Sequence, residues 1–200
     1  MAPGSPLSLI FVLLFLLVAG FYLFRLVHPA IWIAHLDAES EGGHAMMAIG
    51  MIFMLVPEDW LTPFIIRWNI VLFAASALWW MVRLFTRRPL LAMFLRLRGA
   101  SSTVRADAIH ALMHAGMCYL FLLMSSMAFS MTAPGVAVTS LLLVAFALLT
   151  LFYGREVAKD FQATQLSWLQ LGANLAHLLM SGMMCWMCLT TIFMIIRMKG

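Results

Sequence analysis

The sequence predicts an all-α integral membrane protein with six transmembrane helices, arranged as three repeated two-helix hairpins about an axis along the membrane normal. The first observation behind this prediction is composition. Of 200 residues, 64% are hydrophobic and only 10% are charged, whereas soluble domains average roughly 25% charged residues. The second observation is a polar and methionine motif that begins three of the six apolar runs. The net charge of +4 therefore concerns orientation in the membrane and does not indicate nucleic-acid binding.

Six apolar runs are long enough to cross a bilayer, which takes about 20 residues per helix. They cover residues 7–27, 44–57, 64–85, 107–131, 135–157 and 170–197. The second run is short and makes a full span only if its helix begins near residue 39 or tilts little. The first run lacks a basic start and a clear cleavage site, so we interpret it as a retained span and not as a signal peptide. The chain is then a single membrane domain over residues 1–200, without a soluble domain.

Lysine and arginine residues predict the orientation, because cytoplasmic loops carry an excess of both. With six spans, the loops after the first, third and fifth runs share one side of the membrane. That side holds Arg25, Arg83, Arg87, Arg88, Arg96, Arg98, Arg105, Arg155 and Lys159, and the other side holds Arg67, Arg197 and Lys199. We therefore expect a multi-pass protein of the cytoplasmic (inner) membrane, with both termini outside.

The second, fourth and sixth runs, here called the even runs, begin with one shared motif. They read EGGHAMMAIGM, DAIHALMHAGM and NLAHLLMSGMM, which align as [E/D/N]-x2-H-x2-M-x3-M. The motif residues are His44, His110 and His177; Met47, Met113 and Met180; Met51, Met117 and Met184; and Glu41, Asp107 and Asn174. Each odd run also ends near an arginine. The pattern predicts internal repeats at approximately 7–60, 64–131 and 135–197.

The motif places its four residues on one face of a helix. With 3.6 residues per turn and 1.5 Å per residue, the second methionine lies about 20° round and about 10.5 Å along from the histidine. Three such faces meeting round one axis would stack in layers of carboxylate or amide, imidazole, thioether and thioether. We therefore expect the even runs to form an inner ring and the odd runs to lie outside it.

In this repeated H-x2-M-x3-M motif, the sequence resembles an actinobacterial family of uncharacterised multi-span membrane proteins, defined only as a domain of unknown function. The resemblance covers most of the chain. It implies a short multi-span protein, and it implies no activity. His114 and the pair Cys185 and Cys188 have no counterpart that we can place in that family pattern.

Three imidazoles and six thioethers favour Cu(I) as the bound ion. Thioether is a soft, neutral ligand that selects Cu(I) over harder ions, and it needs no costly ionisation inside a membrane. The motif carboxylates would orient the imidazoles through hydrogen bonds. Zinc is less favoured because its sites combine histidine with carboxylate or thiolate. Haem is less favoured because its two axial ligands do not require three equivalent copies of a histidine and methionine motif. The predicted function is binding, storage or handling of Cu(I).

Two alternatives stay open. One is a structural or accessory subunit of a larger membrane complex without metal, and the other is a copper-conducting channel. The expected partners are the lipid bilayer and a copper ion, with either a membrane-protein partner or a second copy of the chain. No catalytic motif is found, so an enzyme is not indicated.

Several conspicuous residues are interpreted as structural. His114, Met54, Met187 and Cys118 are each interpreted as packing residues. The Cys185 and Cys188 pair has metal-binding spacing, but it occurs once and deep in an apolar run, which makes it a weak signal. His28 and His35, together with Asp37, Glu39 and Glu41, are interpreted as a solvated loop.

Overall fold

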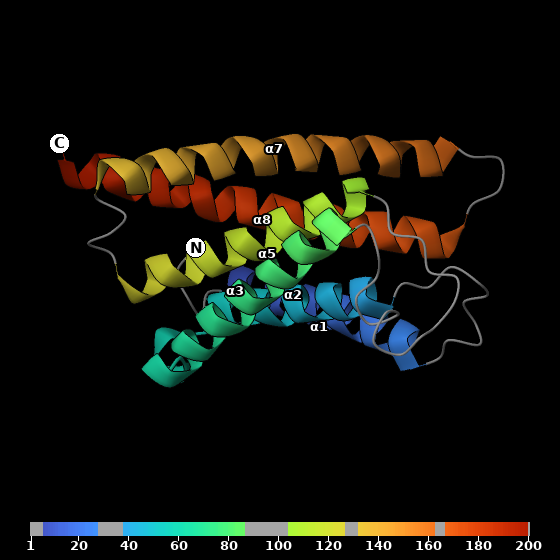
Figure 1. The fold of residues 1–200 in the computed structure, drawn as a ribbon, viewed down its shortest axis with the longest axis horizontal. Coiled ribbons are helices and arrows are strands. Elements are labelled where there is room, and N and C mark those ends of the chain that lie inside the picture. The colour runs from blue at the N-terminus through green and yellow to red at the C-terminus, as the bar shows by residue number, and fades with distance from the viewer. Residues whose placement is uncertain (1–5, 28–37, 87–103, 127–131, 163–166, 200) are drawn as a thin grey trace. The chain divides into compact units, whose positions relative to one another are not determined.

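The structure is a computed structural model that describes residues 6–27, 38–86, 104–126, 132–162 and 167–199 (Figure 1). Within these residues it contains six α-helices, one short 3-10 helix and no strand. The elements are α1 (Pro6–Val27), α2 (Ala38–Leu55), η2 (Glu58–Trp60), α3 (Pro63–Thr86), α5 (Val104–Ser125), α7 (Ala133–Gln162) and α8 (Trp168–Lys199). The predicted all-α class is confirmed.

Two helices differ from the predicted runs at their polar ends. Helix α2 begins at Ala38, so Glu39 and Glu41 lie in its first turn, where the helix dipole favours acidic side chains. Glu41 thus lies on the helix, as the motif predicts, whereas the interpretation of Glu39 as part of a solvated loop is wrong. Helix α7 continues to Gln162, beyond the predicted end at residue 157. The predicted stretch 127–131, like His28 and His35, lies outside the described residues.

Five of the helices, α1, α3, α5, α7 and α8, are long and apolar enough to cross a membrane. Helix α2 is not among them, because its first two turns carry glutamate, serine and glycine in place of apolar side chains. Large apolar side chains on α1 face outward, with Leu13 and Leu17 61% and 71% exposed. Such a surface is suited to lipid and unfavourable in water.

The chain forms two compact units, Met1–Phe121 and Leu122–Gly200. The first unit contains α1, α2, α3 and most of α5, and α1 packs against α2 within it. The second unit contains α7 and α8, which pack against each other along their length (Figure 1).

In the first unit, two glycines on one face of α2 allow close contact with α3 and α5. A Cβ atom added at Gly50 would lie 2.5 Å from Phe73 Cζ and 2.7 Å from Met117 Cε. A Cβ atom added at Gly43 would lie 3.2 Å from Trp80 Cζ2 and 3.3 Å from His114 Nε2. The bare backbone of α2 therefore lies directly against aromatic, thioether and imidazole groups of its neighbours.

In the second unit, small polar residues join α7 to α8. The Thr150 hydroxyl donates to the backbone oxygen of Phe146 at 2.7 Å and lies 3.3 Å from Ser181 Oγ. A Cβ atom added at Gly182 would lie in ordinary contact with Thr150, at 3.8 Å. Small residues at such positions let two helix backbones approach each other closely.

Candidate metal site

The methionines of the repeated motif are all buried. The side chains of Met47, Met51, Met113, Met117, Met180 and Met184 are each 0% exposed. His44 and His110 are also buried, and His177 is partly buried. A methionine stripe that faced lipid would be exposed, so the motif face of each even helix contacts protein.

Two of the three motif histidines lie together in the first unit. The ring centres of His44 on α2 and His110 on α5 are 4.4 Å apart, with an interplanar angle of 53°. Ser40 Oγ forms a hydrogen bond of 2.8 Å with His110 Nε2. A histidine that binds a metal through one ring nitrogen commonly uses the other for such a bond. His177 lies on α8 in the second unit.

Each motif histidine stacks on an aromatic ring from the odd helix of its own hairpin. The stacked pairs, with their ring-centre distances, are Tyr22–His44 at 4.6 Å, Trp80–His110 at 4.2 Å and Tyr153–His177 at 4.6 Å. Offset stacking of this kind restricts the plane of the imidazole. Sequence reasoning missed these rings, although an aromatic residue two or three positions before each odd-helix arginine is a signal that would have found them.

The acids of the motif form ion pairs with the arginines that end the odd helices. Arg25 Nη2 lies 2.8 Å from Glu41 Oε1. Arg83 lies 3.0 Å from Asp107 Oδ1 through Nε and 2.8 Å from Glu39 Oε2 through Nη1. These carboxylates therefore bind guanidinium groups, and their predicted role in orienting the imidazoles stays a prediction.

In the third hairpin, a hydrogen bond between an amide and a carboxylate stands in place of the ion pair between a motif acid and an arginine. Asn174 of the motif is neutral, and its Nδ2 donates to Asp160 Oδ2 on α7 at 2.8 Å. Arg155, which corresponds to Arg25 and Arg83 in the sequence, is exposed. The second unit thus links α7 to α8 at the same motif position through an amide and a carboxylate.

A cavity of about 190 Å³ lies between α2 and α3 in the first unit. It is lined by Glu39, Gly42, Gly43, Met46, Ser76, Trp79 and Trp80. Trp79 Nε1 donates to Glu39 Oε2 at 3.1 Å across this lining. One wall of the cavity is therefore Trp80, the ring that stacks on His110.

Among the residues that the structure describes, no three histidine, cysteine, aspartate or glutamate side chains come together so as to hold a metal ion. A site built from imidazole and thioether ligands does not need such a group, so the predicted ligand set stays a prediction. The three cysteines are free thiols, and Cys188 is buried, whereas Cys118 and Cys185 are partly buried. Cys118 donates to the backbone oxygen of Ile70 at 3.6 Å, as expected of a packing residue.

The fold and these side chains define a class: an all-α protein with five helices apolar enough to cross a membrane, with buried methionines on α2, α5 and α8 and with buried histidines on α2 and α5. Residues 36–191 match the family described as Domain of unknown function (DUF5134). The chain belongs to this family, as the resemblance to an uncharacterised domain implied. No curated protein and no solved structure matches it.

Proposed function

We propose that this is an integral membrane protein that binds Cu(I) through imidazoles and thioethers of α2, α5 and α8, for storage or handling within the membrane. The observation that carries the proposal is that all six motif methionines are 0% exposed. The 4.4 Å separation of the His44 and His110 rings supports it further. These ligands are soft and neutral, which suits Cu(I) in an apolar interior, and buried ionisable residues in membranes generally serve a function.

In this proposal α2, α5 and α8 form an inner ring, and α1, α3 and α7 lie outside it. The most apolar windows of α5 and α8 are 50% and 33% buried, against 22%, 17% and 22% for α1, α3 and α7. The histidine–aromatic stack common to the three hairpins supports a repeated unit. Helix α2 becomes the sixth span, since ion pairs with Arg25 and Arg83 neutralise its two glutamates.

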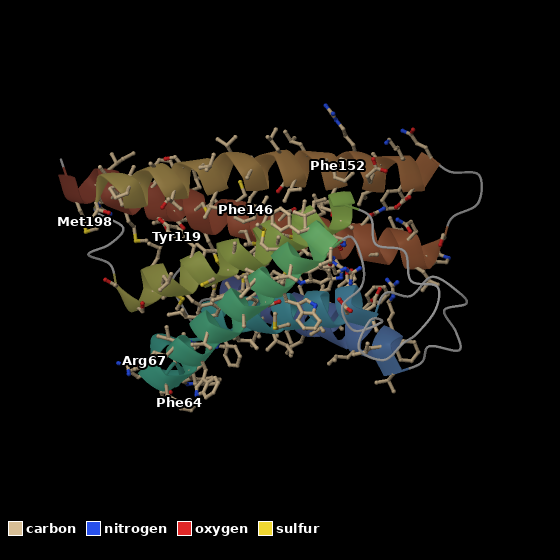
Figure 2. All side chains as sticks on the ribbon, viewed as in Figure 1. Phe64, Arg67, Tyr119, Phe146, Phe152 and Met198 are labelled. Carbon is tan, nitrogen blue, oxygen red and sulfur yellow. The ribbon has the colours of Figure 1, made fainter. Side chains whose placement is uncertain are left out.

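The proposed orientation places on the cytoplasmic side the ends of α1, α3 and α7 that carry Arg25, Arg83 and Arg155, with both chain termini outside. Near the other end of α3, Arg67 and Phe64 both extend away from the helix (Figure 2). Trp60, Phe64 and Trp68 are all exposed there. Aromatic side chains gather at membrane–water interfaces, so this end is suited to the outer interface.

Metal analysis of the purified protein from copper-replete cells tests the proposal. We expect about one copper per chain, as one soft-ligand site would bind. The double variant His110→Ala with His177→Ala is expected to lose the metal, whereas the control variant His35→Ala keeps it. Absence of copper in the wild-type protein contradicts the proposal and favours a structural subunit.

We favour a site that holds copper over a channel that conducts it. Beyond Met117, helix α5 continues with Tyr119 and Phe121, which are both buried. Bulky buried rings oppose the weak, multi-site path that conduction requires. Copper uptake into proteoliposomes that contain a Cu(I) chelator tests this preference. Saturable uptake that disappears when Met117→Leu and Met184→Leu are combined would favour the channel.

A further inference from the structure

His114 is a buried imidazole outside the repeated motif. It is 0% exposed, and neither ring nitrogen has a hydrogen-bond partner among the residues that the structure describes. A neutral imidazole carries one donor and one acceptor nitrogen, and buried polar atoms in native proteins nearly always have partners. Exceptions to this rule often mark a functional role or an ion-binding position.

The surroundings of His114 are apolar rings and bare backbone. Its ring centre lies 5.7 Å from Phe73, 6.2 Å from Trp80 and 6.3 Å from His110. On the side of α2, the ring lies against Gly43, where an added Cβ atom would lie 3.3 Å from His114 Nε2. A packing role alone would be served as well by phenylalanine, because Phe73 and Trp80 contact His114 through their rings and form no hydrogen bond with it.

From this arrangement, we propose that His114 is a ligand of the copper site, together with His110 and Met117. The inference rests on the proposed copper function and adds to it a residue that the repeat does not contain. It also makes the site asymmetric, because α5 then supplies one imidazole more than α2 and α8.

The spacing on α5 suits one ion. His110 and His114 are one helical turn apart, and histidines at i and i+4 on one face form a recurring metal-binding pair. Metal–nitrogen bonds of about 2.0–2.1 Å in a three-coordinate site place the two ring centres roughly 5.5 Å apart. The observed separation is 6.3 Å, so the rings need to approach each other only slightly to hold one ion. Met117 follows on the same face, three residues after His114, and is fully buried. Two imidazoles and one thioether form a soft, neutral ligand set.

The other two repeats have no equivalent of His114. The corresponding positions, four residues after the motif histidine, hold Ala48 and Ser181, both fully buried. Small side chains at these positions offer no imidazole to a metal. The added histidine therefore makes α5 unlike α2 and α8, and it is the reason that we expect an asymmetric site.

The variant His114→Phe tests this inference, because it keeps the ring packing and removes both nitrogens. We expect Cu(I) affinity to fall at least about tenfold, while the thermal midpoint of the metal-free protein stays equal or rises, since an unpartnered polar ring becomes apolar. The control His35→Phe should bind copper like the wild type. Wild-type affinity in His114→Phe overturns the inference and leaves the proposed function intact, whereas a wild-type protein without copper overturns both.

X-ray absorption at the copper edge gives a second readout that does not depend on how a variant folds. In the copper-loaded wild-type protein we expect two nitrogen neighbours and one sulfur neighbour. Copper with sulfur neighbours alone, or with a single nitrogen, overturns the role of His114.

Discussion

At the residue scale, Arg83 contacts three groups that surround the candidate site. Its guanidinium pairs with Asp107 and with Glu39, and it lies 4.8 Å from the centre of the Trp80 ring. Trp80 in turn stacks on His110. A single buried cation at the end of α3 thereby holds the first turns of α2 and α5 and the ring that supports a motif histidine.

Replacing Arg83 is therefore expected to destabilise the protein strongly. In Arg83→Met, Asp107 and Glu39 stay buried without this guanidinium, and removal of one member of a buried ion pair lowers the free energy of unfolding by about 3–5 kcal/mol. Reversible unfolding in mixed micelles measures the change. The control Lys159→Met breaks the exposed pair with Glu156 and should change the value by less than about 1 kcal/mol. Equal effects of the two variants would contradict the role of Arg83.

Helical spacing was enough to predict the buried face of the motif, because residues at i, i+3 and i+7 share one side of a helix. The partners of the motif acids could not be predicted in the same way. Arg83 and Asp107 are separated by the long connection 87–103, and no local pattern fixes which helix end meets which. The sequence predicts a metal-binding role only for residues that recur in all three repeats, and His114 has no counterpart in the other two.

At the element scale, α2 depends on a close approach to its neighbours that larger side chains would prevent. In Gly50→Ala the new Cβ would lie 2.5 Å from the buried ring of Phe73 and 2.7 Å from Met117. Such overpacking lowers the free energy of unfolding by about 1–3 kcal/mol. Reversible unfolding of Gly50→Ala in mixed micelles measures this loss of stability.

The matched control lies on the same helix. Nothing lies within 4 Å of a Cβ atom added at Gly42, so Gly42→Ala should raise stability by up to about 1 kcal/mol through lower backbone entropy of the unfolded chain. If both alanine variants shift stability in the same direction, the close approach at Gly50 does not determine which side chains the packing of α2 tolerates.

The apolar runs predicted the helices well, since each run lies largely inside one observed helix. The predicted runs differ from the observed helices at the polar ends of α2 and α7. Glu39 and Glu41 lie in the first turn of α2, where arginines from α1 and α3 pair with them, and these pairs form only in the tertiary structure. The polar end of α7 stays helical through Gln162, where Lys159 pairs with Glu156 one turn earlier.

At the scale of the whole molecule, the proposed ring of three hairpins makes a prediction about depth. His44, His110 and His177 would lie at one level and face a common centre. Cysteines placed at these positions two at a time, with the native cysteines replaced by alanine, should crosslink in all three combinations. A control pair of His44→Cys with Leu148→Cys, on the exposed face of α7, should not crosslink. Crosslinking of positions 44 and 110 alone would contradict the threefold arrangement.

The central proposal is that buried imidazoles and thioethers bind Cu(I) in this protein. A competition titration of the metal-free protein with Cu(I) and Zn(II) tests it most directly. We predict that Cu(I) binds more tightly by several kcal/mol, at least about a hundredfold, because thioether ligands favour the softer ion. Zn(II) binding as tight as Cu(I) binding, or tighter, would contradict the account.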